Sequence, residues 1–361
     1  MEPILKELPD FYSKILPDFF NTSIPKEKLA TCNACAMCHK KGDLKMATDS
    51  YYLPSTKCCT YHPIIPNYLV GGILQDKNPL MNEGRKRIRD RIKSKHAITP
   101  KGIIMPKKYE AIYKLTAKSS FGKTESLLCP FYEKKGGLCT VWKFRNSICS
   151  TWFCKTVAGE DGKLFWQKLG AYLGDVEMNL GNYCSFSLGI DPDKIIKDNT
   201  VLLPPQLEDL TLEDVNETYN EEDYKKYWGV WVGKEEEYYI RAFDIISKLS
   251  KSEFEKITGT AQMVNLKKLE NAYEKMMYPI LPGKLKRNVG IEINKLADGS
   301  YNLALGAALF NLPDFAYEIL MVFDGALTNK EVILKALNEK NIELEEDFLI
   351  GLYQNRFLIE A

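Results

Sequence analysis

CNACAMCH (residues 32–39) and CPFYEKKGGLCTVWKFRNSICSTWFC (residues 129–154) are the two most informative stretches of this sequence. In the first, Cys32, Cys35 and Cys38 are separated by two residues each, a spacing that turns successive thiolates toward one metal ion or cluster. In the second, Gly136-Gly137 predicts a β-hairpin that returns Cys139 toward Cys129. We therefore expect an α+β fold whose first half is built around a bound metal.

The distribution of cysteine along the chain supports this expectation. The 361 residues contain ten cysteines, and none follows Cys184. The N-terminus lacks a signal-peptide core and no apolar run is long enough to cross a membrane, so we expect a soluble cytoplasmic protein without a membrane partner. A reducing compartment disfavours disulfides, and clustered cysteines there indicate metal or redox chemistry.

Further candidate ligands lie between and beyond the two stretches. Cys58 and Cys59 are adjacent, and in an extended chain their side chains would point in opposite directions, so that only one would share a metal with its neighbours. His39 and His62 are open candidates, whereas Cys184 lies in an apolar context and is expected in the core. The predicted metal ligands are Cys32, Cys35, Cys38, Cys58, Cys59, Cys129, Cys139, Cys149 and Cys154.

The spacing resembles that of the CxxCxxCC (YkgJ-type) cysteine-cluster family, which is described as zinc- or iron-chelating. The resemblance covers residues 32–154 and includes CPFYEKKGGLC, Arg145 and Cys149. It differs at the end of the first motif, where His39 stands in place of a fourth cysteine. The resemblance implies that Cys32, Cys35, Cys38, Cys129, Cys139 and Cys149 are ligands, and it supports metal binding rather than a particular reaction.

The identity of the metal is less strongly determined than its presence. Paired CxxC motifs would favour structural zinc, but the triplet at 32–38 is ferredoxin-like, and Cys129 precedes a proline as the last cysteine of a ferredoxin motif does. The nine candidate thiolates suffice for two four-thiolate sites. We favour an iron–sulfur cluster of the [4Fe–4S] type over zinc.

Three regions follow from the patterns along the chain. Residues 1–190 form the predicted cysteine-cluster metal-binding domain. It starts with short helices broken by prolines, continues with a strand or buried turn at 63–74, and includes helices at 84–95, 107–122 and 161–183. Residues 191–283 combine an acidic linker, to about 225, with two helices at 234–250 and 260–278.

Residues 284–361 read as a small winged-helix-like unit. Strands at 289–296 and 301–309 flank the turn signal Asp298-Gly299, and three short helices and a terminal strand follow. Thr328 and Glu331 form a capping box for the second helix. The order of elements resembles the PqqD-type peptide-binding winged helix, which implies a peptide or protein partner for this domain.

The 49 basic and 48 acidic residues give a net charge of +1, so the total charge does not discriminate between the candidate functions. Only local clusters of charge are informative. Seven of the eleven residues from Arg85 to Lys95 are basic, which is compatible with nucleic-acid binding but is more typical of a solvated helix face. Our first hypothesis is an iron–sulfur protein in redox or modification chemistry on a peptide or protein. The alternatives are a zinc-stabilised nucleic-acid- or protein-binding module and a metal carrier; no catalytic residue is identifiable.

Overall fold

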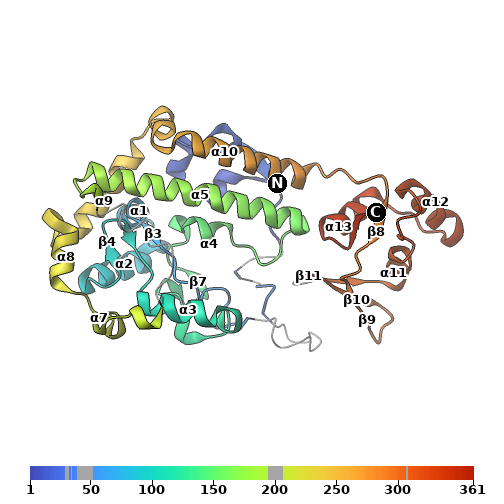
Figure 1. The fold of residues 1–361 in the computed structure, drawn as a ribbon, viewed down its shortest axis with the longest axis horizontal. Coiled ribbons are helices and arrows are strands. Elements are labelled where there is room, and N and C mark those ends of the chain that lie inside the picture. The colour runs from blue at the N-terminus through green and yellow to red at the C-terminus, as the bar shows by residue number, and fades with distance from the viewer. Residues whose placement is uncertain (29–31, 34, 39–51, 194–205, 306–307) are drawn as a thin grey trace. The chain divides into compact units, whose positions relative to one another are not determined.

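The computed structural model describes residues 1–28, 32–33, 35–38, 52–193, 206–305 and 308–361 (Figure 1). Helices predominate and the sheets are small and antiparallel, which confirms the predicted α+β class. His39 lies outside the described residues. No helix of the described segments is long and apolar enough to span a bilayer.

The described chain forms two compact units. The first, which we call the cysteine unit, consists of Met1–Pro25, Thr31–Trp152 and Leu169–Leu266. The second, the C-terminal unit, consists of Lys26–Ala30, Phe153–Lys168 and Lys267–Ala361. The predicted boundaries at 190/191 and 283/284 stay predictions, but the helices from 207 to 266 pack within the cysteine unit.

The N-terminal segment forms 3-10 turns where short helices were predicted. They span Ile4–Glu7, Asp10–Lys14 and Asp18–Asn21, and each directly follows a proline, at Pro3, Pro9 and Pro17. A proline fixes φ for the start of each turn, while the next proline removes the amide that a longer helix would need. Strands β1 (Glu2–Pro3) and β2 (Ser23–Ile24) close this segment into a loop.

Helices are the main regular structure of the cysteine unit. They are α1 (Asn67–Gln75), α2 (Asn82–Ser94), α3 (Lys107–Ser120), α4 (Ser147–Thr151), α7 (Leu212–Asn216), α8 (Glu221–Trp228), α9 (Glu235–Ser247) and parts of α5 (Gly159–Ser187) and α10 (Lys251–Met277). Gly259, with φ +67°, interrupts α10, so a separate helix follows it as predicted for 260–278. A three-stranded sheet has the order β3 (Ile65–Pro66), β5 (Gly102–Ile103), β4 (Ile98–Thr99).

The segment 63–74 differs from its prediction, because most of it is the buried helix α1. Its two glycines are required by close packing rather than by a turn. A Cβ at Gly71 would collide with the carbonyl oxygen of Tyr239 on α9, and a Cβ at Gly72 would collide with the ring of Phe144. Tyr239 and Phe144 are distant in sequence, so the local sequence pattern could not reveal these contacts. It favoured a strand or turn instead.

The C-terminal unit has the predicted order of hairpin, three helices and terminal strand. The elements are β8 (Leu285–Arg287), β9 (Glu292–Lys295), β10 (Tyr301–Leu305), β11 (Ala308–Leu312), α11 (Asp314–Leu320), α12 (Asn329–Lys340), α13 (Glu346–Gln354) and β12 (Leu358–Glu360). Strands β9 and β10 pair antiparallel across Asp298-Gly299, and Thr328 with Glu331 forms the capping box of α12. An additional strand, β11, extends the hairpin, while β12 returns to pair with β8.

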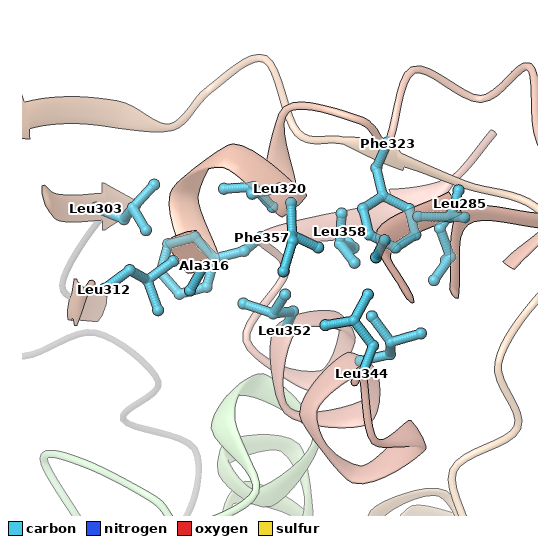
Figure 2. Close-up of a cluster of buried hydrophobic side chains, with 14 residues drawn as sticks. Leu285, Leu303, Leu312, Ala316, Leu320, Phe323, Leu344, Leu352, Phe357 and Leu358 are labelled. Carbon is cyan, nitrogen blue, oxygen red and sulfur yellow. The ribbon is translucent and has the colours of Figure 1, made fainter. Parts of the chain in front are cut away.

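A single hydrophobic core holds these elements together. Figure 2 shows side chains from strands and helices meeting around Phe357 and Leu358, both of which are fully buried. Leu285 of β8, Leu303 of β10 and Leu352 of α13 belong to the same cluster. This apolar cluster, which contains no cysteine, stabilises the unit through burial of apolar surface.

Candidate metal centre

The first cysteine motif forms a tight turn. The amide of Cys38 donates to the carbonyl of Cys35 at 3.2 Å, and the thiols of Cys35 and Cys38 are within hydrogen-bonding reach. The amide of Tyr52 then donates to the carbonyl of Met37 at 2.7 Å. This bond fixes the end of the motif to the start of the segment that carries Cys58 and Cys59.

The second cysteine segment is a series of turns, not an extended strand. Its thiols at Cys58 and Cys59 are within hydrogen-bonding reach of each other, so the opposite directions expected for an extended chain do not apply. Lys57, with φ +51°, projects its ammonium onto the carbonyls of Cys32 at 2.7 Å and Gly137 at 2.8 Å. One lysine thus ties together all three cysteine-bearing segments.

The third segment begins with the predicted hairpin. Strands β6 (Tyr132–Glu133) and β7 (Leu138–Cys139) pair antiparallel, with Tyr132 opposite Cys139, which confirms the turn at Gly136-Gly137. The amide of Cys129 donates to the carbonyl of Cys59 at 2.8 Å. The hairpin therefore carries Cys129 and Cys139 to the second segment.

Cys149 follows on the short helix α4. Its amide donates to the Oδ1 atom of Asn146, the N-cap, at 3.1 Å, and its carbonyl accepts from Arg145 Nη1 at 3.1 Å. Helix α4 is attached to α5 by Glu177, whose carboxylate accepts from the amide of Ser147 at 2.6 Å and from its hydroxyl at 2.8 Å. Sequence analysis missed Glu177, because nothing in the spacing of α5 separates it from surface acids.

Eight thiols from the three segments lie close enough for the charge on one to oppose ionisation of another. Cys58 interacts in this way with Cys32, Cys38, Cys59 and Cys149. Cys129 interacts with Cys139 and Cys149, and Cys139 interacts with Cys32. The eight are Cys32, Cys35, Cys38, Cys58, Cys59, Cys129, Cys139 and Cys149.

Burial keeps most of these thiols protonated. It raises the pKa of Cys149 and of Cys38 to about 12, and it raises the pKa of Cys129 further still. The hydrogen bond from its neighbour, followed by burial, raises the pKa of Cys58 well above the ordinary range. A metal ion entering this region would have to displace protons from sulfur.

Positive side chains surround the thiols. The guanidinium of Arg145 favours ionisation of Cys32, Cys139 and Cys149, and also of Cys58. Lys57 has the same effect on Cys32 and Cys38, and Arg87 has it on Cys139. Such an environment suits a donor set that becomes negatively charged when a metal replaces the thiol protons.

The remaining candidate ligands behave differently. Cys154 belongs to the C-terminal unit, and Cys184 is fully buried with its thiol 3.5 Å from the carbonyl of Ala242, as expected for a core residue. His62 stacks on Tyr109, and its Nε2 atom lies 3.0 Å from the carbonyl of Leu128. Burial lowers the pKa of His62 to about 4, and its buried Nδ1 atom has no partner among the described residues. A neutral ring with one nitrogen held by a carbonyl is a common form of a metal-binding histidine.

The described thiols lie near one another, but they are not arranged as the ligands of a metal ion. Within the described segments, no group of three or more His, Cys, Asp or Glu side chains is arranged to hold a metal ion. The described thiols nevertheless lie near the cations Arg145, Lys57 and Arg87.

The basic helix α2 is used mainly within the protein. Arg87 bonds to Glu83, Glu133 and the carbonyls of Pro130 and Tyr132, and thereby supports the cysteine hairpin. Arg89 pairs with Glu236, and Arg85 bonds to Asn82 and the carbonyl of Asp76. These bonds would have to break before the same guanidinium groups could contact phosphates.

Comparison of the chain with protein-family models, curated proteins and solved structures gives no match. The resemblance to the YkgJ-type cysteine-cluster family and the resemblance of residues 284–361 to the PqqD-type winged helix therefore stay predictions. The arguments that follow depend on the residues of this chain alone.

Proposed function

We propose that this is a cytoplasmic metal-cluster protein whose thiols hold an iron–sulfur cluster used in redox or modification chemistry on a peptide or protein partner. The observation that carries the proposal is the convergence of eight thiols from three segments of the chain. Apolar packing alone does not require this, because buried cysteines serving as small apolar residues are dispersed through a core, as Cys184 is.

The chemistry of the surroundings supports an anionic, thiolate-rich centre. Arg145, Lys57 and Arg87 favour thiolates, and a thiolate is the form of cysteine that binds metal. An iron–sulfur cluster would supply one-electron transfer, while the protein binds it, excludes water and sets its electrostatic environment. The described cysteines form no disulfide, as expected for the reducing compartment that we propose.

The C-terminal unit supplies the proposed place for the partner. Its order of strands, three helices and terminal strand is the order that we predicted for a winged-helix-like unit, and it contributes no cysteine after Cys154. We assign it a recognition role because its own core is complete and does not need the metal. Nucleic acid is disfavoured as the partner of α2, whose arginines Arg85, Arg87 and Arg89 bond within the protein.

Anaerobic purification followed by iron, zinc and acid-labile sulfide analysis tests the proposal. We expect a brown protein with stoichiometric iron and sulfide and with broad absorption that dithionite bleaches. The variants C35A and C139A should each lose metal, whereas C184A, the matched control in the apolar core, should keep it. A colourless wild-type protein with stoichiometric zinc would support the zinc-stabilised alternative, and one without bound metal would refute metal binding altogether.

A further inference from the structure

Residues 206–223, which we call the acidic segment, carry eight acidic side chains and no basic one. The segment belongs to the cysteine unit and forms the 3-10 turn Leu207–Asp209, helix α7 and the start of α8. Both the turn and α7 lie against α3, as Figure 1 shows for α7. The start of α3 and the end of α2, which contact this segment, are basic.

Two lysines at the start of α3 bind the acidic segment. The Nζ atom of Lys107 pairs with Oδ2 of Asp214 at 3.3 Å, and the Nζ atom of Lys108 donates to the carbonyl of Val215 at 2.9 Å. The same Oδ2 atom of Asp214 accepts from the amide of Thr211 at 3.0 Å, in the capping box of α7. The capping box therefore fixes the position of the carboxylate that Lys107 contacts.

The end of α2 adds an aromatic contact to this interface. The Nζ atom of Lys95, where the chain leaves α2, lies 5.1 Å from the ring centroid of Tyr219 and 5.1 Å from that of Tyr224. Both distances are within the range of cation–π attraction. Lys95 thus holds the end of the acidic segment through its tyrosines rather than through its acids.

Glu217 brings further negative charge to the same area. Burial lowers the pKa of Arg91 and of His96, and the negative charge of Glu217 acts against this in both cases. The Nη1 atom of Arg91 lies 3.4 Å from Nδ1 of His96, so the two side chains are neighbours. The side chains that contact the acidic segment directly, which we call the basic surface, are Lys95, Lys107 and Lys108.

The acidic segment is held at α7 by charge and not by apolar burial. Neither the turn Leu207–Asp209 nor α7 buries a residue. Leu212 is 77% exposed, whereas the side chain of Asp214 is only 18% exposed. A helix that is packed permanently on a globular protein turns its apolar face inward, and α7 is oriented the other way. Exposed ion pairs contribute little in water and are screened by salt, so this contact is easily displaced.

The groups that the basic surface contacts are those of a peptide. Lys107 contacts a carboxylate, Lys108 a main-chain carbonyl and Lys95 aromatic rings. The phosphate backbone of a nucleic-acid duplex would offer anionic oxygens but neither of the other two groups. Charge and chemistry therefore favour an acidic peptide as the ligand of this surface.

We propose that the basic surface is a docking site for an acidic peptide of a partner protein, and that the acidic segment occupies it as an internal pseudo-ligand which the partner displaces. The inference goes beyond the function proposed above, because it assigns a protein-binding surface to the cysteine unit. It does not depend on a bound metal.

The experiment uses the full chain and a fluorescein-labelled synthetic peptide of residues 206–223 as the probe. Fluorescence anisotropy measures binding to the wild type, to D214N/E217Q, which weakens the internal contact, and to D214N/E217Q combined with K107A/K108A. The matched control is D214N/E217Q combined with K256A, which changes an exposed lysine on α10 of the same unit. Circular dichroism checks that each variant folds.

We expect D214N/E217Q to bind the peptide roughly fivefold more tightly than the wild type, since the internal charge contacts no longer compete as well. K107A/K108A should abolish this gain, and K256A should leave it unchanged. A peptide with amides in place of its acids should not bind, and added salt should weaken binding of the acidic peptide.

Three results would overturn the inference. Equal affinity of the wild type and D214N/E217Q would show that the acidic segment does not compete for the surface. Unchanged binding after K107A/K108A would show that the peptide binds elsewhere. Tighter binding of a short DNA duplex than of the peptide would assign the surface to nucleic acid instead. Metal content, measured in the same samples, tests the proposed function separately.

Discussion

The C-terminal unit and the cysteine-bearing part of the cysteine unit are stabilised in different ways. In the C-terminal unit, Phe357 and Leu358 are fully buried and belong to one apolar cluster. Around the thiols, by contrast, the described residues form only short elements, such as the two-residue strands β6 and β7, the 3-10 turn Trp142–Phe144 and the short helix α4. Cross-segment hydrogen bonds, such as those of Lys57 and of the Cys129 amide, hold this part together.

The difference indicates that the thiol region, and not the C-terminal unit, would depend on metal coordination for its stability. Apolar burial stabilises the C-terminal unit without outside help, whereas turns and two-residue strands rarely hold a fixed structure alone. A bound metal would cross-link the three cysteine segments and supply the missing stability. The two regions should therefore respond in opposite ways to metal removal and to core mutations.

Metal removal should have the largest effect, and it should be confined to one region. We expect chelation to destabilise the thiol region by about 5 kcal/mol or more, since structural metals contribute roughly 10 kcal/mol in small domains. Hydrogen exchange by mass spectrometry should show lost protection at 52–62 and 129–151 and unchanged protection at 285–361. Equal loss of protection in both regions would contradict the comparison.

Truncating a core side chain of the C-terminal unit should destabilise that unit and leave the thiol region unchanged. Phe357 is fully buried, so F357A should destabilise the C-terminal unit by about 3 to 5 kcal/mol through lost apolar contacts and a new cavity. Leu334 on α12 is 56% exposed, and L334A is the matched control, with an expected change under about 0.5 kcal/mol. Chemical denaturation monitors stability, and metal content should stay at the wild-type value in both variants. Loss of metal in F357A alone would show that the two regions are coupled.

Glu177 allows a smaller, pH-dependent test within the cysteine unit. Burial raises the pKa of Glu177 to about 8. Between pH 4.5 and about 8 the carboxyl is ionised in the unfolded chain but still protonated in the folded protein, so the folded state loses stability as the pH rises. Gln can accept from the Ser147 amide and donate to its hydroxyl, as a protonated Glu would. Relative to the wild type, E177Q should therefore gain on the order of 1 to 2 kcal/mol of stability between pH 5 and pH 8.

Thermal or urea unfolding of the metal-free protein across this pH range measures the gain. The control is E255Q, which changes an exposed glutamate on α10 and should leave the pH dependence unaltered. A constant difference between E177Q and the wild type at all pH values would show that Glu177 does not titrate in this range.

Local signals predicted much of the fold correctly. The hairpin at 132–139, the helix α2 and the capping box of α12 each depend on residues within a few positions of one another. The prediction for 63–74 was wrong because Gly71 and Gly72 serve contacts with α9 and Phe144, which are far away in sequence. Periodicity cannot reveal such a contact.

The candidate site, too, was predicted from local sequence only in part. Cysteine spacing identified the thiols, since residue type and local separation are sufficient to suggest shared ligation. It did not identify Glu177 or the role of Lys57, because an acid or a lysine acquires such a role only through the distant groups that it contacts.

The sequence by itself determined which residues carry sulfur, where the chain turns and which half is free of cysteine, because these are properties of composition and short-range geometry. Only the tertiary structure decided that eight thiols lie near one another, that Cys184 packs against the carbonyl of Ala242 instead, and that Arg145 contacts the carbonyl of Cys149. The physical reason is that electrostatic interaction and burial depend on distance in space, which packing between remote segments sets.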